Sequence, residues 1–121
     1  MRLRHLGLPV LDLERSLAFY RLYFGFDAAT TQTYPDGTVI MRNDDDFDLA
    51  LHPVAQLVSD PEFLHFGFQL DSSQQIRDTL ARLTSDGVEI VEADEEPGYV
   101  SFKCLDPDGH RIEVYWEPRD K

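Results

Sequence analysis

Two stretches of the chain alternate apolar and polar side chains, which is the period of a β-strand. In residues 4–10, the apolar side chains of Leu6, Leu8 and Val10 share one face. A similar alternation of apolar residues opens the second half of the chain over residues 64–70. The pattern predicts one strand at the start of each half.

A stretch with apolar side chains at helical spacing follows each of these strands. Asp12 is placed to cap a first helix and Gly25 to end it. In the second half, Ser72 and Gln75 have the spacing of a capping box, and Gly87 is placed to close the helix. The predicted inward faces of the two helices carry Leu13, Leu17, Tyr20 and Phe24, and Ile76, Leu80 and Leu83.

Three more strands are expected after each helix, so that each half has the order βαβββ. The expected strands are residues 27–33, 38–42 and 47–52 in the first half and 88–93, 99–104 and 110–116 in the second. Turn sequences at 35–37 and 106–109 separate strands of one half. We therefore predict an α+β fold built from two paired βαβββ modules. The whole chain, 1–121, is expected to be one domain, with module 1 at 1–53, a linker at 54–62 and module 2 at 63–121.

Composition narrows the possible partners. The net charge of −12 disfavours binding to nucleic acid or to an anionic membrane. One cysteine, Cys104, excludes an intramolecular disulfide and fits a reducing compartment. No apolar run has the length of a membrane-spanning helix, and no signal-peptide pattern opens the chain. We expect a cytoplasmic globular protein in which the acidic run 44–46 is a solvated loop.

Two histidines and one carboxylate hold related positions in the two halves. His5 and His65 occupy the same place in the repeat, and Glu113 stands where the first half has Ala50. Their strand neighbours are apolar, so these three side chains are expected on the sheet face away from the helices. Imidazole and carboxylate together suit a divalent ion such as Fe, Mn, Ni, Zn or Co. The sequence therefore predicts one metal site formed by His5, His65 and Glu113.

The chain resembles the vicinal oxygen chelate superfamily, which includes glyoxalase I, fosfomycin-resistance proteins, extradiol dioxygenases, methylmalonyl-CoA epimerase and bleomycin-resistance proteins. The residues that carry the resemblance are HLGLPV at 5–10, DLERSLAFY at 12–20, GF at 25–26, HFGF at 65–68 and DPDGHRIE at 106–113. The resemblance implies an open, curved barrel of mixed β-sheet with the helices on its convex side. It also implies a homodimer and a divalent metal held by His5, His65 and Glu113.

The resemblance also separates the branches of that superfamily. Enzymes that resemble glyoxalase I carry a glutamate at the position of Ala50, whose methyl group can neither bind metal nor accept a proton. This disfavours the glyoxalase reaction, although His52 lies two residues on and on the same face. The His-His-Glu set is the one that fosfomycin-resistance enzymes and extradiol dioxygenases use.

Other polar side chains are expected on the same face as the metal ligands. His52, Tyr99 and Tyr115 are the candidates for catalysis, because an imidazole titrates near neutral pH and a phenol can donate a proton. The candidates for substrate binding are Ser101, Lys103 and Arg111. The alternative for each is a solvated strand residue, and for Arg111 this alternative is favoured.

Three further residues are expected to have no catalytic role. His110 lies in the turn before the last strand and is expected to be exposed. Cys104 and Trp116 fall on the helix side of their strands by alternation and are expected in the core.

Two functions from different classes remain at this point. The first is a metal-dependent enzyme (a lyase, transferase or dioxygenase) that binds a small oxygen-rich substrate through two oxygens and stabilises an oxyanion. The second is a metal-free protein that sequesters a small molecule, similar to bleomycin-resistance proteins. The ligand triad favours the enzyme, and the negative charge fits a protein that binds a cationic drug.

Overall fold

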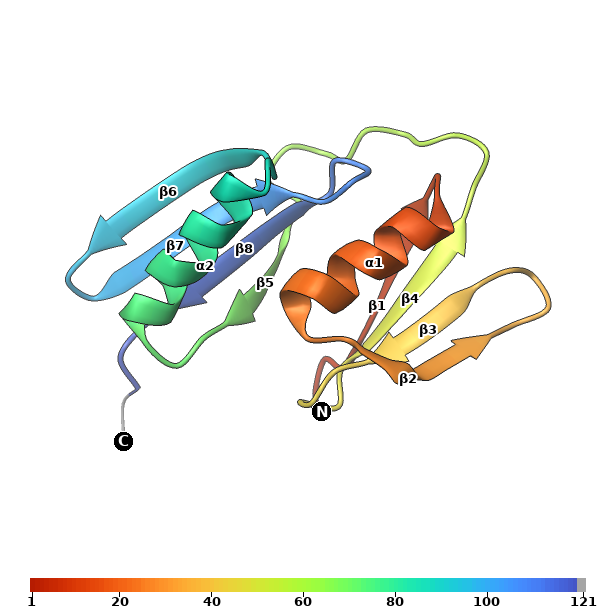
Figure 1. The fold of residues 1–121 in the computed structure, drawn as a ribbon, viewed down its shortest axis with the longest axis horizontal. Coiled ribbons are helices and arrows are strands. Elements are labelled where there is room, and N and C mark those ends of the chain that lie inside the picture. The colour runs from red at the N-terminus through yellow and green to blue at the C-terminus, as the bar shows by residue number, and fades with distance from the viewer. Residues whose placement is uncertain (120–121) are drawn as a thin grey trace. The chain divides into compact units, whose positions relative to one another are not determined.

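The computed structural model describes residues 1–119, and the chain divides into a unit Met1–Val58 and a second unit that begins at Ser59. This boundary lies inside the segment 54–62 that we expected to be a linker. Figure 1 shows the same order of elements in both units.

Unit 1 is a four-stranded mixed sheet with one helix. Its elements are β1 His5–Val10, α1 Leu13–Phe24, β2 Asp27–Thr33, β3 Val39–Arg42 and β4 Asp48–Pro53. The strand order is β1-β4-β3-β2, in which β1 and β4 are parallel and the other neighbours antiparallel. Helix α1 lies along one face of this sheet (Figure 1).

Unit 2 repeats this plan. Its elements are β5 Phe66–Gln69, α2 Ser73–Ser85, β6 Ile90–Glu96, β7 Tyr99–Leu105 and β8 Arg111–Trp116. The strand order is β5-β8-β7-β6, again with one parallel pair, β5 and β8. The predicted α+β fold of two βαβββ modules is confirmed, and neither sheet closes on itself.

The predicted helix ends are confirmed. The Asp12 side chain accepts a hydrogen bond from the Arg15 amide at 3.1 Å, and Gly25 ends α1 with φ of 73°. At the start of α2, Ser72 and Gln75 form the reciprocal capping box. Among the described residues, no helix is long and apolar enough to span a bilayer.

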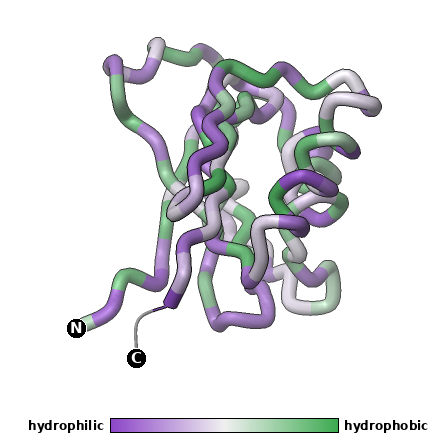
Figure 2. Tube along the Cα trace, turned by 90° about the vertical axis from the view of Figure 1, so that its left-hand side faces the viewer, coloured by the Kyte–Doolittle hydropathy of each residue, from purple (hydrophilic) through white to green (hydrophobic). Residues whose placement is uncertain are grey.

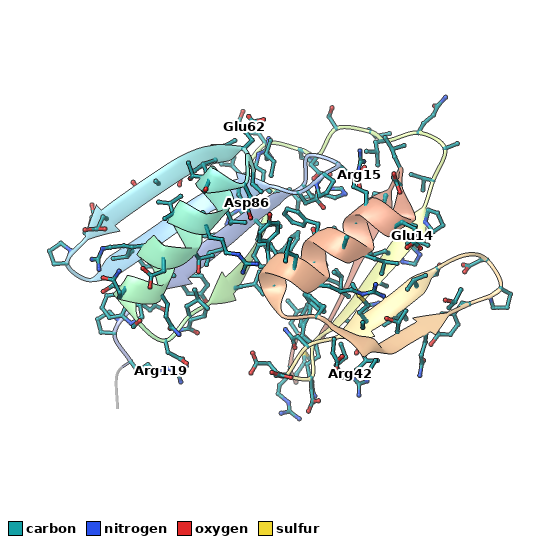
Figure 3. All side chains as sticks on the ribbon, viewed as in Figure 1. Glu14, Arg15, Arg42, Glu62, Asp86 and Arg119 are labelled. Atoms are coloured by element: carbon teal, nitrogen blue, oxygen red, sulfur yellow. The ribbon has the colours of Figure 1, made fainter. Side chains whose placement is uncertain are left out.

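Apolar side chains on the helix side of each sheet form the cores. Figure 2 shows hydrophobic and hydrophilic residues interspersed along the trace. The buried residues include Leu17, Tyr20, Met41, Leu49 and Leu51 in unit 1, and Ile76, Leu83, Phe102, Cys104, Ile112 and Val114 in unit 2. Charged side chains such as those of Arg42, Glu62 and Arg119 are exposed and point outward (Figure 3). The prediction that Cys104 lies in the core is confirmed, whereas Trp116 is only partly buried.

The expectation that His110 is exposed was wrong. Its side chain is almost fully buried, because the imidazole Nδ1 donates to Asp60 Oδ2 at 2.8 Å. Asp60 is 50 positions away along the chain, so local alternation carries no sign of this contact. Strand β6 also begins later than expected, because the Val88 amide still donates to the Leu83 carbonyl at the end of α2.

The strand register shows how the two units correspond. Gly7 on β1 pairs with Ala50 on β4, and Gly67 on β5 pairs with Glu113 on β8. Ala50 and Glu113 are therefore structural equivalents. Both lie on the sheet face opposite the helix, because the residues that flank them on their strands are buried against the helix. We call this face of each unit its open face.

Candidate functional site

His65 and Glu113 form the centre of the candidate site in unit 2. His65 lies one residue before β5, and Glu113 lies on β8. The parallel pairing of these strands brings His65 Nε2 to 3.2 Å from Glu113 Oε1. The carboxylate is well shielded, since the Glu113 side chain is 16% exposed, against 34% for His65. The structure thus brings together two of the three predicted ligands.

The imidazole of His65 is oriented by the backbone. Its Nδ1 lies 2.8 Å from the Phe63 carbonyl oxygen, which can only accept, so Nδ1 carries the proton of this hydrogen bond. In the neutral ring, Nε2 then presents a lone pair to the Glu113 carboxylate. Two acceptors that face each other need a proton or a cation between them.

The distance between these two atoms fits a shared metal ion. With metal–ligand bonds of about 2.1 Å, ligand atoms 3.2 Å apart subtend an angle of about 100° at the ion. That angle suits neighbouring positions in a tetrahedral or octahedral shell. The donor set is therefore compatible with the predicted divalent ion.

Tyr99 holds the other oxygen of the same carboxylate. Its hydroxyl donates to Glu113 Oε2 at 2.5 Å. Burial, followed by the hydrogen bond with Glu113, raises the pKa of Tyr99, so the phenol keeps its proton at neutral pH and acts as a donor. The Tyr99 ring stacks on Tyr115, with centroids 5.9 Å apart and planes inclined by 21°.

The other predicted residues of unit 2 are engaged by the chain itself. Lys103 Nζ lies 3.4 Å from Glu92 Oε2, and the Arg111 guanidinium donates to the Pro61 carbonyl at 3.1 Å. Ser101 is buried on β7. Both cations therefore have acceptors within unit 2.

Unit 1 presents His5 and His52 on its open face. His5 is exposed on β1. His52 Nδ1 lies 2.9 Å from the Thr38 hydroxyl oxygen. The Asp36 carboxylate accepts from the Thr38 amide at 2.9 Å, and hydrogen bonds from the Thr38 amide and side chain lower the pKa of Asp36.

These contacts select a tautomer of His52. A Thr38 hydroxyl that donates to Asp36 accepts from His52 Nδ1, which leaves Nε2 as the basic nitrogen. A Cβ atom built on Gly7 would lie 3.1 Å from this Nε2, so the imidazole lies against the glycine. Sequence reasoning missed Thr38 and Asp36 as partners of His52, although Asp36 belongs to the predicted turn at 35–37.

Tyr115 is the counterpart of His52 in unit 2. A Cβ atom on Gly67 would lie 3.3 Å from Tyr115 Cε1, just as one on Gly7 meets His52. The two glycines thus allow a ring to lie against the strand at equivalent positions. His52 and Tyr115 therefore occupy equivalent positions on the open faces of the two units.

Taken unit by unit, residues 1–119 contain no group of three His, Cys, Asp or Glu side chains that could hold a metal ion. His65 and Glu113 are the two predicted ligands that the structure brings together. His5 of unit 1 remains the predicted third ligand.

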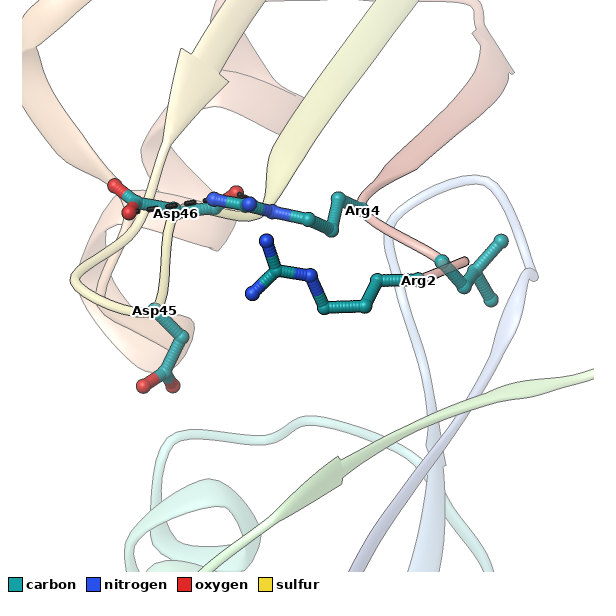
Figure 4. Close-up of a pocket in the computed structure, with 5 residues that line it drawn as sticks. Arg2, Arg4, Asp45 and Asp46 are labelled. Carbon is teal, nitrogen blue, oxygen red and sulfur yellow. Dashed lines mark hydrogen bonds and ion pairs between the residues drawn. The ribbon is translucent and has the colours of Figure 1, made fainter.

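Two hollows in unit 1 include none of the predicted site residues. One, of about 600 Å³, is lined by Arg2, Leu3, Arg4, Asp45 and Asp46 (Figure 4). There Arg4 Nη2 lies 3.3 Å from Asp46 Oδ2, so an arginine partly neutralises the exposed acidic loop 44–46. The other, of about 380 Å³, lies beside β2 and β3 and is lined by residues that include Thr30, Gln32, Ile40 and Arg42.

Comparison with known proteins identifies relatives over nearly the whole chain. A probable trivalent organoarsenical cleaving enzyme of Bacillus subtilis is 31% identical over 120 residues, which cover 96% of this chain and 80% of that protein. The structure of a possible glyoxalase from Bacillus cereus is 30% identical with a TM-score of 0.79, covering 94% of this chain and 97% of that one.

A more distant structure shows the same fold. It is the fosfomycin resistance protein FosX of Listeria monocytogenes in complex with Mn(II) and sulfate, which is 18% identical with a TM-score of 0.80. The alignment covers 97% of this chain and 90% of that one. The model of the glyoxalase/bleomycin resistance protein/dioxygenase superfamily matches residues 2–114, and the chain therefore belongs to this superfamily.

Proposed function

We propose that this chain is a divalent-metal-dependent enzyme that acts on a small oxygen-rich substrate. His65 and Glu113 supply two ligands and His5 the third. The observation that carries the proposal is the pair of facing acceptors, His65 Nε2 and Glu113 Oε1, 3.2 Å apart with the imidazole already oriented through Nδ1. Relatives that are named as enzymes, and a bound Mn(II) in FosX, support the same chemistry.

The residues around the pair have separate roles in this proposal. A bound Fe, Mn, Ni, Zn or Co ion supplies Lewis-acid stabilisation of negative charge on a substrate oxygen. Tyr99 fixes the carboxylate by donating to its second oxygen. His52 is the proton-transfer group, because its Thr38 contact leaves Nε2 basic.

Tyr115, Ser101 and Lys103 complete the proposed open face of unit 2. Tyr115 donates a hydrogen bond to the substrate, and Ser101 and Lys103 bind it. Lys103 shares its charge with Glu92, which lies 3.4 Å away. A substrate with a strongly anionic group would therefore have to compete with a carboxylate of the protein for this ammonium.

We propose that the substrate is not a trivalent organoarsenical, the compound that the name of the Bacillus subtilis relative indicates. Trivalent arsenic is a soft centre that prefers thiolate ligands. The only sulfhydryl of this chain, Cys104, is fully buried, and burial raises its pKa to about 12. No accessible thiolate is therefore available to bind arsenic, and oxygen donors on the substrate are the natural partners of the proposed ion.

Metal content tests the proposal most directly. Protein made without a histidine tag is incubated with each candidate ion, freed of excess metal and analysed. Wild type should retain metal, and His5→Ala, His65→Ala and Glu113→Ala should lose it while His52→Ala keeps it. Wild-type protein that folds normally but retains no ion would support the second candidate, a metal-free sequestering protein, for which the net charge of −12 is the supporting observation.

We further propose that the chain forms a homodimer, and the origin of His5 can be tested by mixing variants. His5→Ala and Glu113→Ala are unfolded together and refolded. If His5 acts across two chains, a mixed dimer regains one intact site and metal returns. If His5 acts within its own chain, the mixture stays empty.

Activity screening then separates the branches of the superfamily. Metal-loaded protein is assayed with catechols, with fosfomycin and thiols, and with methylglyoxal hemithioacetal, alongside Ala50→Glu. Turnover of the hemithioacetal by Ala50→Glu alone would show that the missing glutamate blocks the glyoxalase reaction.

A further inference from the structure

We infer that Arg111 is a positioning residue that orients the metal ligand His65 through the turn at residues 61–64. The inference rests on the proposed function for the role of His65, but the orientation itself is a property of the metal-free chain. It assigns to Arg111 a structural task in the site instead of substrate binding.

The turn has a backbone conformation that its sequence disfavours. The Leu64 amide donates to the Pro61 carbonyl at 3.2 Å, which closes a four-residue turn. Its third residue, Phe63, has φ of 72°, as in a type II turn, where glycine is the usual residue. The Phe63 ring is 80% exposed, so burial of the ring does not offset this backbone strain.

Side chains from the start of β8 hold the turn in place. Arg111 Nη1 donates to the Pro61 carbonyl at 3.1 Å and lies 3.5 Å from the Leu64 carbonyl oxygen. One residue before the turn, Asp60 accepts from the buried His110 at 2.8 Å. The strained turn is therefore fixed at its first and last carbonyls and at the residue that precedes it.

The strained residue is the one that orients the ligand. With φ positive at Phe63, its carbonyl oxygen lies 2.8 Å from His65 Nδ1. This hydrogen bond favours the tautomer with the proton on Nδ1, whereas the Glu113 carboxylate favours the one with the proton on Nε2. A turn that relaxed at Phe63 would release Nδ1, and the tautomer that donates from Nε2 to Glu113 would then gain population.

Two variants and a matched control test the inference. Arg111→Met keeps the aliphatic stem and removes the donors, and Phe63→Val places a β-branched residue where φ is positive. Arg77→Met is the control, because Arg77 lies on α2 and pairs with Glu95 on β6 at 2.8 Å. The first measurement is the His65 tautomer in metal-free protein, from ¹⁵N shifts of the ring nitrogens at a pH at which imidazole is neutral. The second is Mn(II) or Zn(II) affinity.

We expect wild type and Arg77→Met to have the same fraction of the Nδ1–H tautomer, and Arg111→Met and Phe63→Val to have a smaller fraction, because Glu113 then draws the proton to Nε2. Metal affinity should fall by about 10–100-fold in both, as for other residues that orient a metal-bound histidine. An unchanged tautomer fraction in Arg111→Met, or in Phe63→Val if Arg111→Met does not fold, overturns the inference. If wild type binds no metal but the tautomer changes as expected, the proposed function fails and the inference stands.

Discussion

Replacing Glu113 by glutamine should weaken metal binding strongly and leave the free energy of unfolding nearly unchanged. Glutamine keeps the shape of the side chain but removes its charge and adds an amide donor. In metal-free protein that donor can reach the His65 Nε2 lone pair, 3.2 Å from the present oxygen, for a gain of about 1 kcal/mol. The Tyr99 hydrogen bond loses its charged acceptor, for a loss of about 1 kcal/mol. The free energy of unfolding should therefore change by less than about 1 kcal/mol.

Metal affinity of the same variant should fall by about 100-fold or more, which corresponds to about 2.7 kcal/mol. Urea denaturation with chelator present measures the first quantity, and metal titration measures the second. Glu95→Gln is the control, since Glu95 pairs with Arg77 on the surface. The reasoning is refuted if Glu113→Gln loses 3 to 5 kcal/mol, about the cost of breaking a buried ion pair, and binds metal like Glu95→Gln. The pair would then be a simple ion pair with a protonated imidazole.

Three other predictions follow from backbone and burial. Gly7→Ala should displace the His52 ring, since the new Cβ would lie 3.1 Å from Nε2, and turnover should fall by about tenfold. Gly98→Ala is the control, because a Cβ at that position would meet no atom within 4 Å, and it should leave turnover unchanged. Phe63→Gly should raise the free energy of unfolding by about 0.5–1 kcal/mol by relieving the positive φ, and a lower denaturation midpoint would contradict this. Burial raises the pKa of Cys104 from 9.0 to about 12, so its contribution to stability is full below pH 9 and is lost as pH rises toward 12. The free energy of unfolding should decline between pH 9 and pH 12 in wild type, and it should decline less in Cys104→Ala. Thiol reagents should modify Cys104 only after the protein unfolds.

The parts of the fold that depend on near neighbours could be predicted from the sequence. The cap at Asp12 and the capping box of Ser72 and Gln75 involve residues three positions apart, so their side-chain chemistry is visible in the sequence. Strand alternation likewise placed Glu113 opposite the buried face, because side chains of a strand alternate strictly. The repeat then predicted which residues correspond, and the sheet register confirms that Ala50 and Glu113 are equivalent.

The contacts that orient the site could not be predicted in this way. The partner of His110 is an aspartate 50 positions away, and the partner of His65 Nδ1 is a backbone carbonyl, which has no signature in a sequence. The turn at 61–64 contains no glycine, so the positive φ of Phe63 had no local signal either. The His110 contact forms only when distant parts of the chain come together, whereas the His65 contact is local but depends on a backbone conformation that no residue type in the turn indicates.

One of the two equivalent positions carries an alanine and the other a glutamate, and this difference limits the number of metal ions that each chain can bind in the proposed site. Each polypeptide has a single Glu113 and, in its other half, only the methyl group of Ala50 at the matching place. However many copies assemble, the number of ions that they bind in this manner cannot exceed the number of chains. In the proposed site Ala50 supplies no ligand, so strand β4 of unit 1, which also carries His52, remains available for other chemistry.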